Sequence, residues 1–362
     1  MTGVRAFAGP LRYVQGPDAL DLLPPVLAPY GPRPLLVTDT YVQSLLGARL
    51  SSLLADLSPA FLLLRGEITA GAADALAAAG RPVGAGVVVG VGGGKALDAA
   101  KAVSLRLGLP VVTVPTVASN DSPTSGAVAM YDDDHRLAAV DRLPANPHAV
   151  VVDTALVAAA PVRFLRSGVG DAVAKTFEAA GCRAGSGVTA LGTRPLLVGS
   201  ALADACYAVL REHAVAGLAA CERGEVDDSL EALVEAVVLL SGLGFENGGL
   251  SLAHSLTRGL MRARGASTAM HGEHVAWATL VQLRVTGASA DEIDDLRAFL
   301  VACGLPVTLA GLGMPDSTAE EVRAIAAVTM TAPHLANLAV PVDEDLLVDA
   351  ILAIEGHVES RA

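Results

Sequence analysis

Five short apolar runs, each ended by turn residues, occupy the first 160 residues and constrain the fold most. They are PLLVTD (34–39), AFLLLRG (60–66), GAGVVVGVGGG (84–94), PVVTVPT (110–116) and AVVVDT (149–154). Helical patterns lie between several of them, and strands that alternate with helices form a parallel sheet covered on both faces. From residue 161 onward the β signal gives way to alanine- and leucine-rich helical patterns. We therefore predict an α/β domain over residues 1–160 and an all-α domain over residues 161–362, a division that the length of 362 residues also favours.

The stretch GVGGGKALDAAK (90–101) resembles a phosphate-binding loop, but two common motifs fail on spacing. Val89 and Ala96 stand where a P-loop needs glycine and Ser or Thr, and Lys95 stands where a dinucleotide fingerprint needs its third glycine. Glycines still allow close backbone approach to a diphosphate, and the following helix offers free N–H groups. A tight strand-to-helix turn without a ligand is the alternative. If a ligand binds, Asp39, this loop and TVASNDSPTSG (116–126) should line one edge of the sheet.

Charge and composition narrow the choice of partner. The chain has 38 acidic and 25 basic residues, a formal charge of −13, and no clustered basic stretch, which disfavours nucleic acid and anionic membranes. A small-molecule substrate is favoured instead. The first residues lack the pattern of a signal peptide, so we expect a cytoplasmic protein. With 52% hydrophobic residues, contacts between copies are plausible, and four cysteines without a C-x-x-C pair indicate buried thiols.

Three residues of the second half are candidate metal ligands: Asp171 in SGVGDAVAKTFE, His254 in GGLSLAHSLTRG and His271 in AMHGEHVAWATL. Taken singly, Asp171 could cap a helix and His254 could be a core histidine with a satisfied ring nitrogen. Taken together, two imidazoles and one carboxylate suit a borderline divalent ion such as zinc. Three protein ligands would leave one position open for a substrate.

The motifs GVGGGKALDAAKAV, PTVASNDSPTSG, SGVGDA, GFENGGLSLAH and HGEHVAWATLVQL agree in order and spacing with one family. The chain resembles the glycerol dehydrogenases of the iron-containing (group III) polyol and alcohol dehydrogenase superfamily over nearly its whole length. The resemblance implies an N-terminal Rossmann-like domain, a C-terminal helical domain with the dehydroquinate synthase-like fold, and an active site between them. It also implies a homo-oligomer, with an octamer among the expected forms.

The resemblance assigns roles by motif. It implies Asp171, His254 and His271 as ligands of one divalent metal, zinc in glycerol dehydrogenases and iron in other branches. It places Asp121 and His254 beside the substrate hydroxyls, so that Asp121, Asp171, His254 and His271 form the catalytic group. For NAD it implies Asp39 at the adenosine ribose and Gly93, Gly94, Lys95 and Asp98 at the pyrophosphate. Thr116, Ser119, Ser125, Ala127 and Tyr131 complete the implied cofactor residues.

The implied reaction is oxidation of a small polyol, glycerol to dihydroxyacetone or a related diol or cyclitol. A bound metal lowers the pKa of an alcohol, and hydride passes from the adjacent carbon to NAD. Asp121 could accept the proton through another substrate hydroxyl.

Departures from the family pattern surround this site. The family usually reads His-Ala-x-His-Asn-Gly where this chain has His254 to Gly259, and its histidines before the last ligand are replaced by ASTAM (266–270). Near residue 336 the usual His-Asn-Met-Pro is also altered. Arg258 either reaches the substrate cleft, where it would favour anionic or densely hydroxylated substrates, or pairs with a surface glutamate.

Two other functions are open. A dehydroquinate synthase-like lyase shares the architecture, NAD and a metal, but it binds a phosphorylated sugar with several basic residues, whereas this chain has only three lysines. A non-catalytic nucleotide-binding oligomer would not need intact metal ligands.

Overall fold

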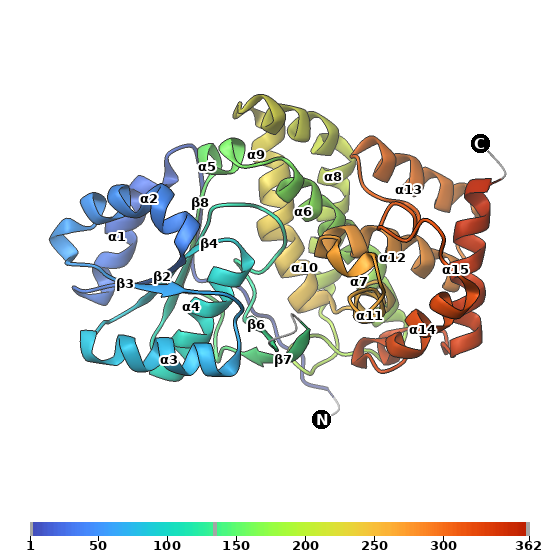
Figure 1. Ribbon diagram of the computed structural model, residues 1–362, viewed down its shortest axis with the longest axis horizontal. Coiled ribbons are helices and arrows are strands. Elements are labelled where there is room, and N and C mark those ends of the chain that lie inside the picture. Colours follow the sequence, from blue (N-terminus) through green and yellow to red (C-terminus); the bar gives the residue numbers. More distant parts are fainter. Residues whose placement is uncertain (1–2, 133–135, 360–362) are drawn as a thin grey trace.

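The computed structural model describes residues 3–132 and 136–359, in which an α/β half lies beside a helical half (Figure 1). The α/β half is built on a six-stranded parallel sheet with the strand order β1-β8-β5-β4-β2-β3. Its strands are β1 (Tyr13–Gly16), β2 (Leu35–Asp39), β3 (Ala60–Leu64), β4 (Val88–Gly92), β5 (Val111–Pro115) and β8 (Ala149–Asp153). The five predicted strands are confirmed.

Three strands were not anticipated. β1 is only four residues long and half-buried, so it lacks the apolar run of the central strands. β6 (Ala127–Tyr131) and β7 (Leu137–Arg142) form a separate antiparallel pair, and β7 is largely exposed. Sequence patterns detect buried parallel strands better than such short or solvated ones.

Alternate residues of the central strands enter separate cores on the two faces of the sheet. Leu36 and Val89 pack with residues of α1 and α2, whereas Leu35, Val37 and Val88 pack with residues of α3 and α4. This burial on both sides explains the continuous valine and leucine runs. The helices of this half are α1 (Leu23–Leu27), α2 (Thr40–Leu53), α3 (Ala70–Gly80) and α4 (Gly94–Leu107), with the short 3-10 helices Ala19–Leu22, Ala28–Tyr30, Ala55–Leu57 and Arg81–Val83.

Helices α5 to α9 and α11 to α15 contribute side chains to one large core in the second half, and Val150 and Val152 of β8 also pack into it. The helices of this half are α5 (Thr154–Ala159), α6 (Arg163–Val173), α7 (Lys175–Ala184), α8 (Leu197–Arg223), α9 (Asp228–Glu235), α10 (Ser241–Gly248), α11 (Leu252–Leu260), α12 (His271–Val285), α13 (Ala290–Ala302), α14 (Ala319–Thr329) and α15 (Glu344–Glu359). A π-helical turn (Ala236–Leu240) joins α9 to α10, and 3-10 turns span Ala266–Thr268 and Pro333–Asn337. The predicted fold class, an α/β half followed by a helical half, is confirmed.

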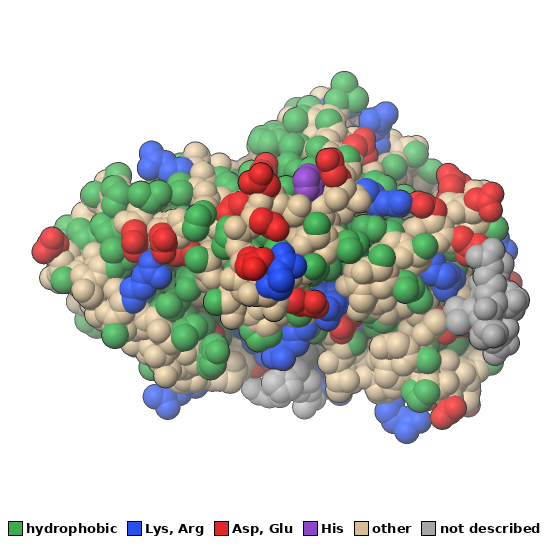
Figure 2. Space-filling model, turned by 90° about the horizontal axis from the view of Figure 1, so that it is seen from above, with side chains coloured by type: hydrophobic (Ala, Val, Ile, Leu, Met, Phe, Trp, Pro, Cys, Tyr) green, Lys and Arg blue, Asp and Glu red, His purple; other side chains and the backbone are tan. Residues whose placement is uncertain are grey.

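The distribution of charged side chains on the surface agrees with the lack of a clustered basic stretch in the sequence. On the face shown in Figure 2, acidic and basic side chains are interspersed over both halves. All four cysteines are buried and free, as predicted. No helix within residues 3–132 and 136–359 is both long enough and apolar enough to cross a membrane.

Candidate active site and metal centre

The carboxyl ends of β2, β4 and β5 lie side by side, since Gly92 pairs with Pro115 and β2 is the other neighbour of β4. Asp39 ends β2 and caps α2 by accepting a hydrogen bond from the Val42 N–H at 2.8 Å. A Cβ atom on Gly92 would lie 3.5 Å from Asp39 Oδ2. The carboxylate of Asp39 therefore stands next to the glycine loop.

Two positions in the stretch 90–95 require glycine, Gly92 because of its backbone conformation and Gly90 because of its close packing against α4. Gly92 has φ +148°, a conformation that L side chains rarely adopt, and a Cβ on Gly90 would lie 2.7 Å from the Cβ of Ala100. α4 begins directly afterwards at Gly94. Lys95 is exposed, and its ammonium pairs with the buried carboxylate of Glu67 at 2.7 Å. The loop thus presents glycine backbone and a helix start at the sheet edge, the arrangement that suits an anion.

Asp98 faces inward rather than toward the glycine loop's open side. It accepts hydrogen bonds from Ser122 Oγ at 2.9 Å and from Lys101 Nζ at 3.4 Å. Burial raises the pKa of Asp98, and the Lys101 ammonium and the Ser122 hydroxyl oppose that shift. Lys101 also donates to the carbonyl of Ala127 at 2.9 Å. Asp98 and Lys101 therefore tie α4 to the 116–127 segment.

The other predicted cofactor residues follow this segment from the glycine loop to β6. The Thr116 N–H donates to the Gly92 carbonyl at 3.0 Å, and the Ser119 carbonyl accepts from Ser167 Oγ of α6 at 3.3 Å. Ser125 is buried, and burial raises the pKa of Tyr131 to about 12. The segment bridges both halves of the molecule.

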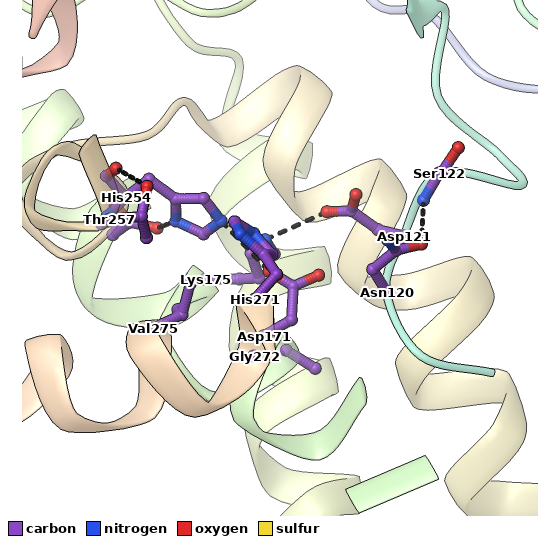
Figure 3. A network of polar contacts seen from close by, with 12 residues as sticks. Asn120, Asp121, Ser122, Asp171, Lys175, His254, Thr257, His271, Gly272 and Val275 are labelled. Carbon is purple, nitrogen blue, oxygen red and sulfur yellow. Dashed lines mark hydrogen bonds and ion pairs between the residues drawn. The ribbon is translucent and has the colours of Figure 1, made fainter. Parts of the chain in front are cut away.

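Asp171, His254 and His271 come together from α6, α11 and α12 (Figure 3). Asp171 Oδ1 lies 3.1 Å from His254 Nε2 and 3.5 Å from His271 Nε2, and the three ligand atoms all lie within 4.8 Å of one another. Ligand atoms of a tetrahedral ion with bonds of about 2.0–2.1 Å are separated by about 3.3 Å. The donor set and the two separations measured from Asp171 therefore fit a divalent metal. Asp171 lies in the last turn of α6, so the helix-capping interpretation is wrong.

Two glycines make this convergence feasible. A Cβ on Gly170 would lie 2.2 Å from the Gly272 carbonyl oxygen, and a Cβ on Gly272 would lie 1.7 Å from the Ser167 carbonyl oxygen. α6 and α12 therefore cross with their backbones in contact. This crossing brings Asp171 and His271, the neighbours of these glycines, into one site.

The two histidines of HGEH serve different purposes. His271 opens α12 and joins the cluster with a side chain that is 42% exposed. His274 is buried, and its Nε2 lies 2.7 Å from the Ala266 carbonyl oxygen. Glu273 accepts the Met270 N–H at 2.7 Å and so closes the start of the helix.

Glu178 of α7 is a site residue that the motif analysis did not identify. Its fully buried carboxylate lies 2.6 Å from His254 Nδ1 and also accepts the N–H groups of Ser251 and His254. A carboxylate behind a histidine fixes the ring orientation and directs Nε2 toward a metal. Its position seven residues after Asp171, two helical turns along the chain, was the only available signal.

Lys175 and Asp121 complete the polar cluster. Lys175 Nζ lies 3.0 Å from both Asp171 Oδ1 and Asp121 Oδ2. Burial raises the pKa of Asp171, but the Lys175 ammonium and the two histidines outweigh burial and hold it well below its usual range. Burial lowers the pKa of His254, but Glu178 and Asp171 raise it to about 9. The cluster thus balances buried carboxylates against its own cations.

Among the residues that the structure describes, Arg258 does not form the pair with a surface glutamate that was one of its two expected roles. Arg258 Nη1 donates to the carbonyl and hydroxyl oxygens of Thr331 at 2.9 and 3.1 Å, and within the described part of the chain it forms no ion pair with a glutamate. The altered region near residue 336 is structural as well, because Asn337 is buried and donates to the Leu250 carbonyl at 2.7 Å.

Residues 14–161 match the family described as iron-containing alcohol dehydrogenase. A glycerol dehydrogenase of Escherichia coli is 37% identical over 89% of this chain and 88% of its own length. A glycolaldehyde reductase of Halobacterium salinarum is 38% identical, over 90% of this chain and 89% of its own. The crystal structure of a probable glycerol dehydrogenase from Sinorhizobium meliloti superposes with a TM-score of 0.92 at 36% identity, covering 99% of this chain and 100% of that one.

A parallel sheet with a glycine loop at its carboxyl edge, beside helices that gather a carboxylate and two histidines, is the architecture of a group III dehydrogenase. The similarity to the Escherichia coli glycerol dehydrogenase covers both the sheet and the helices that hold the three residues. The chain therefore belongs to the iron-containing alcohol dehydrogenase family. The resemblance to glycerol dehydrogenases is confirmed.

Proposed function

We propose that this protein oxidises glycerol or a related small diol or cyclitol with NAD as the hydride acceptor. The observation that carries the proposal is the convergence of Asp171, His254 and His271 beside the segment that begins at the glycine loop. Glycerol dehydrogenases at 37–38% identity support the substrate class. The relative named glycolaldehyde reductase supports a test of small aldehydes in the reverse direction.

Asp171, His254 and His271 would hold one divalent ion, which we propose to be zinc. When bound, the ion supplies Lewis acidity that lowers the pKa of an alcohol. Glu178 keeps His254 turned toward the ion. Asp121, at the opposite side of the cluster, accepts a proton or a hydrogen bond from a substrate hydroxyl.

The cofactor is assigned to the sheet edge and the bridging segment. In this proposal Asp39 holds the adenosine ribose, and the backbone around Gly93 and Gly94 holds the pyrophosphate. The remaining assigned residues are Lys95, Asp98, Thr116, Ser119, Ser125, Ala127 and Tyr131. Since Asp98 is enclosed by Ser122 and Lys101, it acts by shaping the segment.

We also propose that the chain divides into two domains, at 1–160 and 161–362. In this proposal the protein is cytoplasmic and forms a homo-oligomer. Tyr41 and Leu45 lie one turn apart on α2 and are both exposed, so this helix offers an apolar surface for a contact between copies. Light scattering on purified protein would give the subunit number.

To test the function, the protein is first stripped of metal with a chelator and then reloaded with zinc or with iron. NADH formation by each reloaded sample is followed. Glycerol, 1,2-propanediol, butanediols, aminocyclitols and phosphorylated polyols serve as substrates, and glycolaldehyde is tested with NADH. We expect stoichiometric NADH from a simple diol. A dehydroquinate synthase-like lyase would regenerate its NAD in each turnover, so the absence of net NADH with every diol would overturn the proposal.

A further inference from the structure

Lys175 begins α7 and is almost completely buried beside Asp171 and His254 of the metal cluster. Its ammonium contacts Asp171 Oδ1 at 3.0 Å, Asp121 Oδ2 at 3.0 Å and His254 Nε2 at 3.2 Å. The ring of Phe245 lies 5.7 Å away. Figure 3 shows the lysine directed into the space between the ligands of α6 and α11 and Asp121 of the bridging segment.

Two of these contacts use atoms that a metal would need. His254 Nδ1 faces Glu178 at 2.6 Å, so Nε2 is the nitrogen left for a metal. A metal bound to Nε2 would lie about 2.0–2.1 Å from that nitrogen, and Lys175 Nζ already lies 3.2 Å from it. An ammonium group and a metal ion therefore compete for the space in front of Nε2. Asp171 Oδ1 likewise lies 3.0 Å from Lys175 Nζ, at hydrogen-bond distance. The same oxygen lies 3.1 Å and 3.5 Å from the Nε2 atoms of His254 and His271, the spacing expected of ligands that share one ion.

The charges support the same exchange. The carboxylates of Asp171 and Glu178 are buried, and buried carboxylates need a cation close by. Lys175 supplies that cation in the metal-free cluster. A divalent ion at the same place would supply it instead and leave Asp121 as the carboxylate partner of the ammonium.

We propose that Lys175 is a tethered cation that occupies the metal position in the metal-free protein and withdraws toward Asp121 when the ion binds. The proposal rests on the metal site of the proposed function. It makes Lys175 a residue that lowers metal affinity, keeps the metal-free protein folded, and orients Asp121 in the loaded protein.

The test compares Lys175→Met with the parent. Methionine keeps the length of an unbranched side chain and removes the ammonium. We expect the zinc Kd, measured by competition with a chelating dye, to fall roughly tenfold or more, because charge-assisted hydrogen bonds no longer have to be broken. We also expect the Tm of the chelated variant to fall and its zinc-induced rise in Tm to exceed that of the parent. A variant that folds only with zinc present would meet the same expectation.

Lys101→Met is the matched control. Lys101 is also fully buried and bonded to an aspartate, Asp98, but it does not contact the metal cluster. Its loss should lower the Tm of the chelated protein and leave the zinc Kd of the folded protein unchanged. Equal zinc Kd values for Lys175→Met and the parent would overturn the proposal.

A second measurement uses the parent alone, so it does not depend on how the variant folds. In a crystal structure of the zinc-loaded parent, Lys175 Nζ should lie beyond hydrogen-bond distance of His254 Nε2 and within it of Asp121. An ammonium still bonded to His254 Nε2 beside a bound ion would overturn the exchange. Failure of both the parent and Lys175→Met to bind zinc would overturn the metal assignment itself, which is a distinguishable result.

Discussion

The carboxylate of Glu178 lies 2.6 Å from Nδ1 of His254, although 76 residues separate the two in the sequence. This contact fixes the ring so that Nε2 faces Asp171 at 3.1 Å. It joins α7 to α11 behind the proposed metal position, and it is therefore where the geometry of the site can be altered without removing a ligand.

Replacing Glu178 with glutamine should weaken zinc binding by about 10- to 100-fold, since carboxylates behind metal-bound histidines have effects of that size. The amide cannot match the charge that supports the ring. The zinc Kd measured by competition checks this expectation. Glu246→Gln is the control, because Glu246 is also buried but accepts from the Gly126 N–H at 2.9 Å instead of a metal ligand. A zinc Kd for Glu178→Gln equal to that of the parent would refute the role.

Gly272→Ala should disrupt the crossing of α6 and α12. The new Cβ would lie 1.7 Å from the Ser167 carbonyl oxygen and 2.9 Å from the Asp171 backbone nitrogen, so the helices must separate. We expect a loss of about 3 kcal/mol or more in the free energy of unfolding, together with a loss of bound metal. Urea unfolding of chelated protein and metal analysis measure the two effects. Gly356→Ala in α15 is the control, since nothing lies within 4 Å of its new Cβ, and unchanged metal binding in both variants would contradict the prediction.

Asp39→Asn should reduce the preference for NAD over NADP. Asparagine can still accept the Val42 N–H that caps α2, so the substitution removes mainly the charge that would repel a 2′-phosphate. The ratio of kcat/KM values for the two cofactors is the measurement. A ratio identical to that of the parent would show that Asp39 does not contact the ribose.

Stability should fall in mild acid because of His274. Burial lowers the pKa of His274 to about 4, and its Nδ1 has no hydrogen-bond partner among the described residues. The unfolded chain takes up a proton near pH 6.5 that the folded ring accepts only near pH 4, so stability is lost as the pH falls between these values. For His274→Gln we expect the loss between pH 7 and pH 5 to be smaller by about 2 kcal/mol. Urea unfolding of the chelated proteins tests this, and equal losses would count against His274 as the cause.

Sequence reasoning worked best where one local pattern determines the outcome. The valine runs of β4 and β5 are continuous because both faces of the sheet are covered. Such runs therefore predict buried parallel strands. β1 has no such run because it is half-buried at an edge. Asp171, His254 and His271 lie in motifs whose order and spacing agree with the family, and their proximity followed from this resemblance rather than from any periodicity.

Contacts between segments that are distant in the sequence were not predicted. Glu178 belongs to the cluster because α7 contacts His254 of α11, 76 residues further on, an arrangement that no local pattern encodes. Lys175 lies only four residues after Asp171, but this spacing alone did not show that its ammonium enters the cluster. A surface glutamate was one expected partner of Arg258, but Thr331, 73 residues further on, accepts its hydrogen bonds. Long side chains bond to whatever the tertiary fold brings near, so spacing alone cannot choose their partners.

The bare backbone contact between α6 and α12 has a mechanical consequence. With Gly170 and Gly272 at the crossing, no side chains separate the two helices, so one cannot slide past the other without a steric clash. α11 packs against α12, so His254 moves together with α6 and α12 as one rigid unit. The glycine loop belongs to the other half of the molecule. Under the proposed function, the distance between the metal site and the cofactor edge would therefore change by movement of one half relative to the other, while the three ligands keep their mutual spacing.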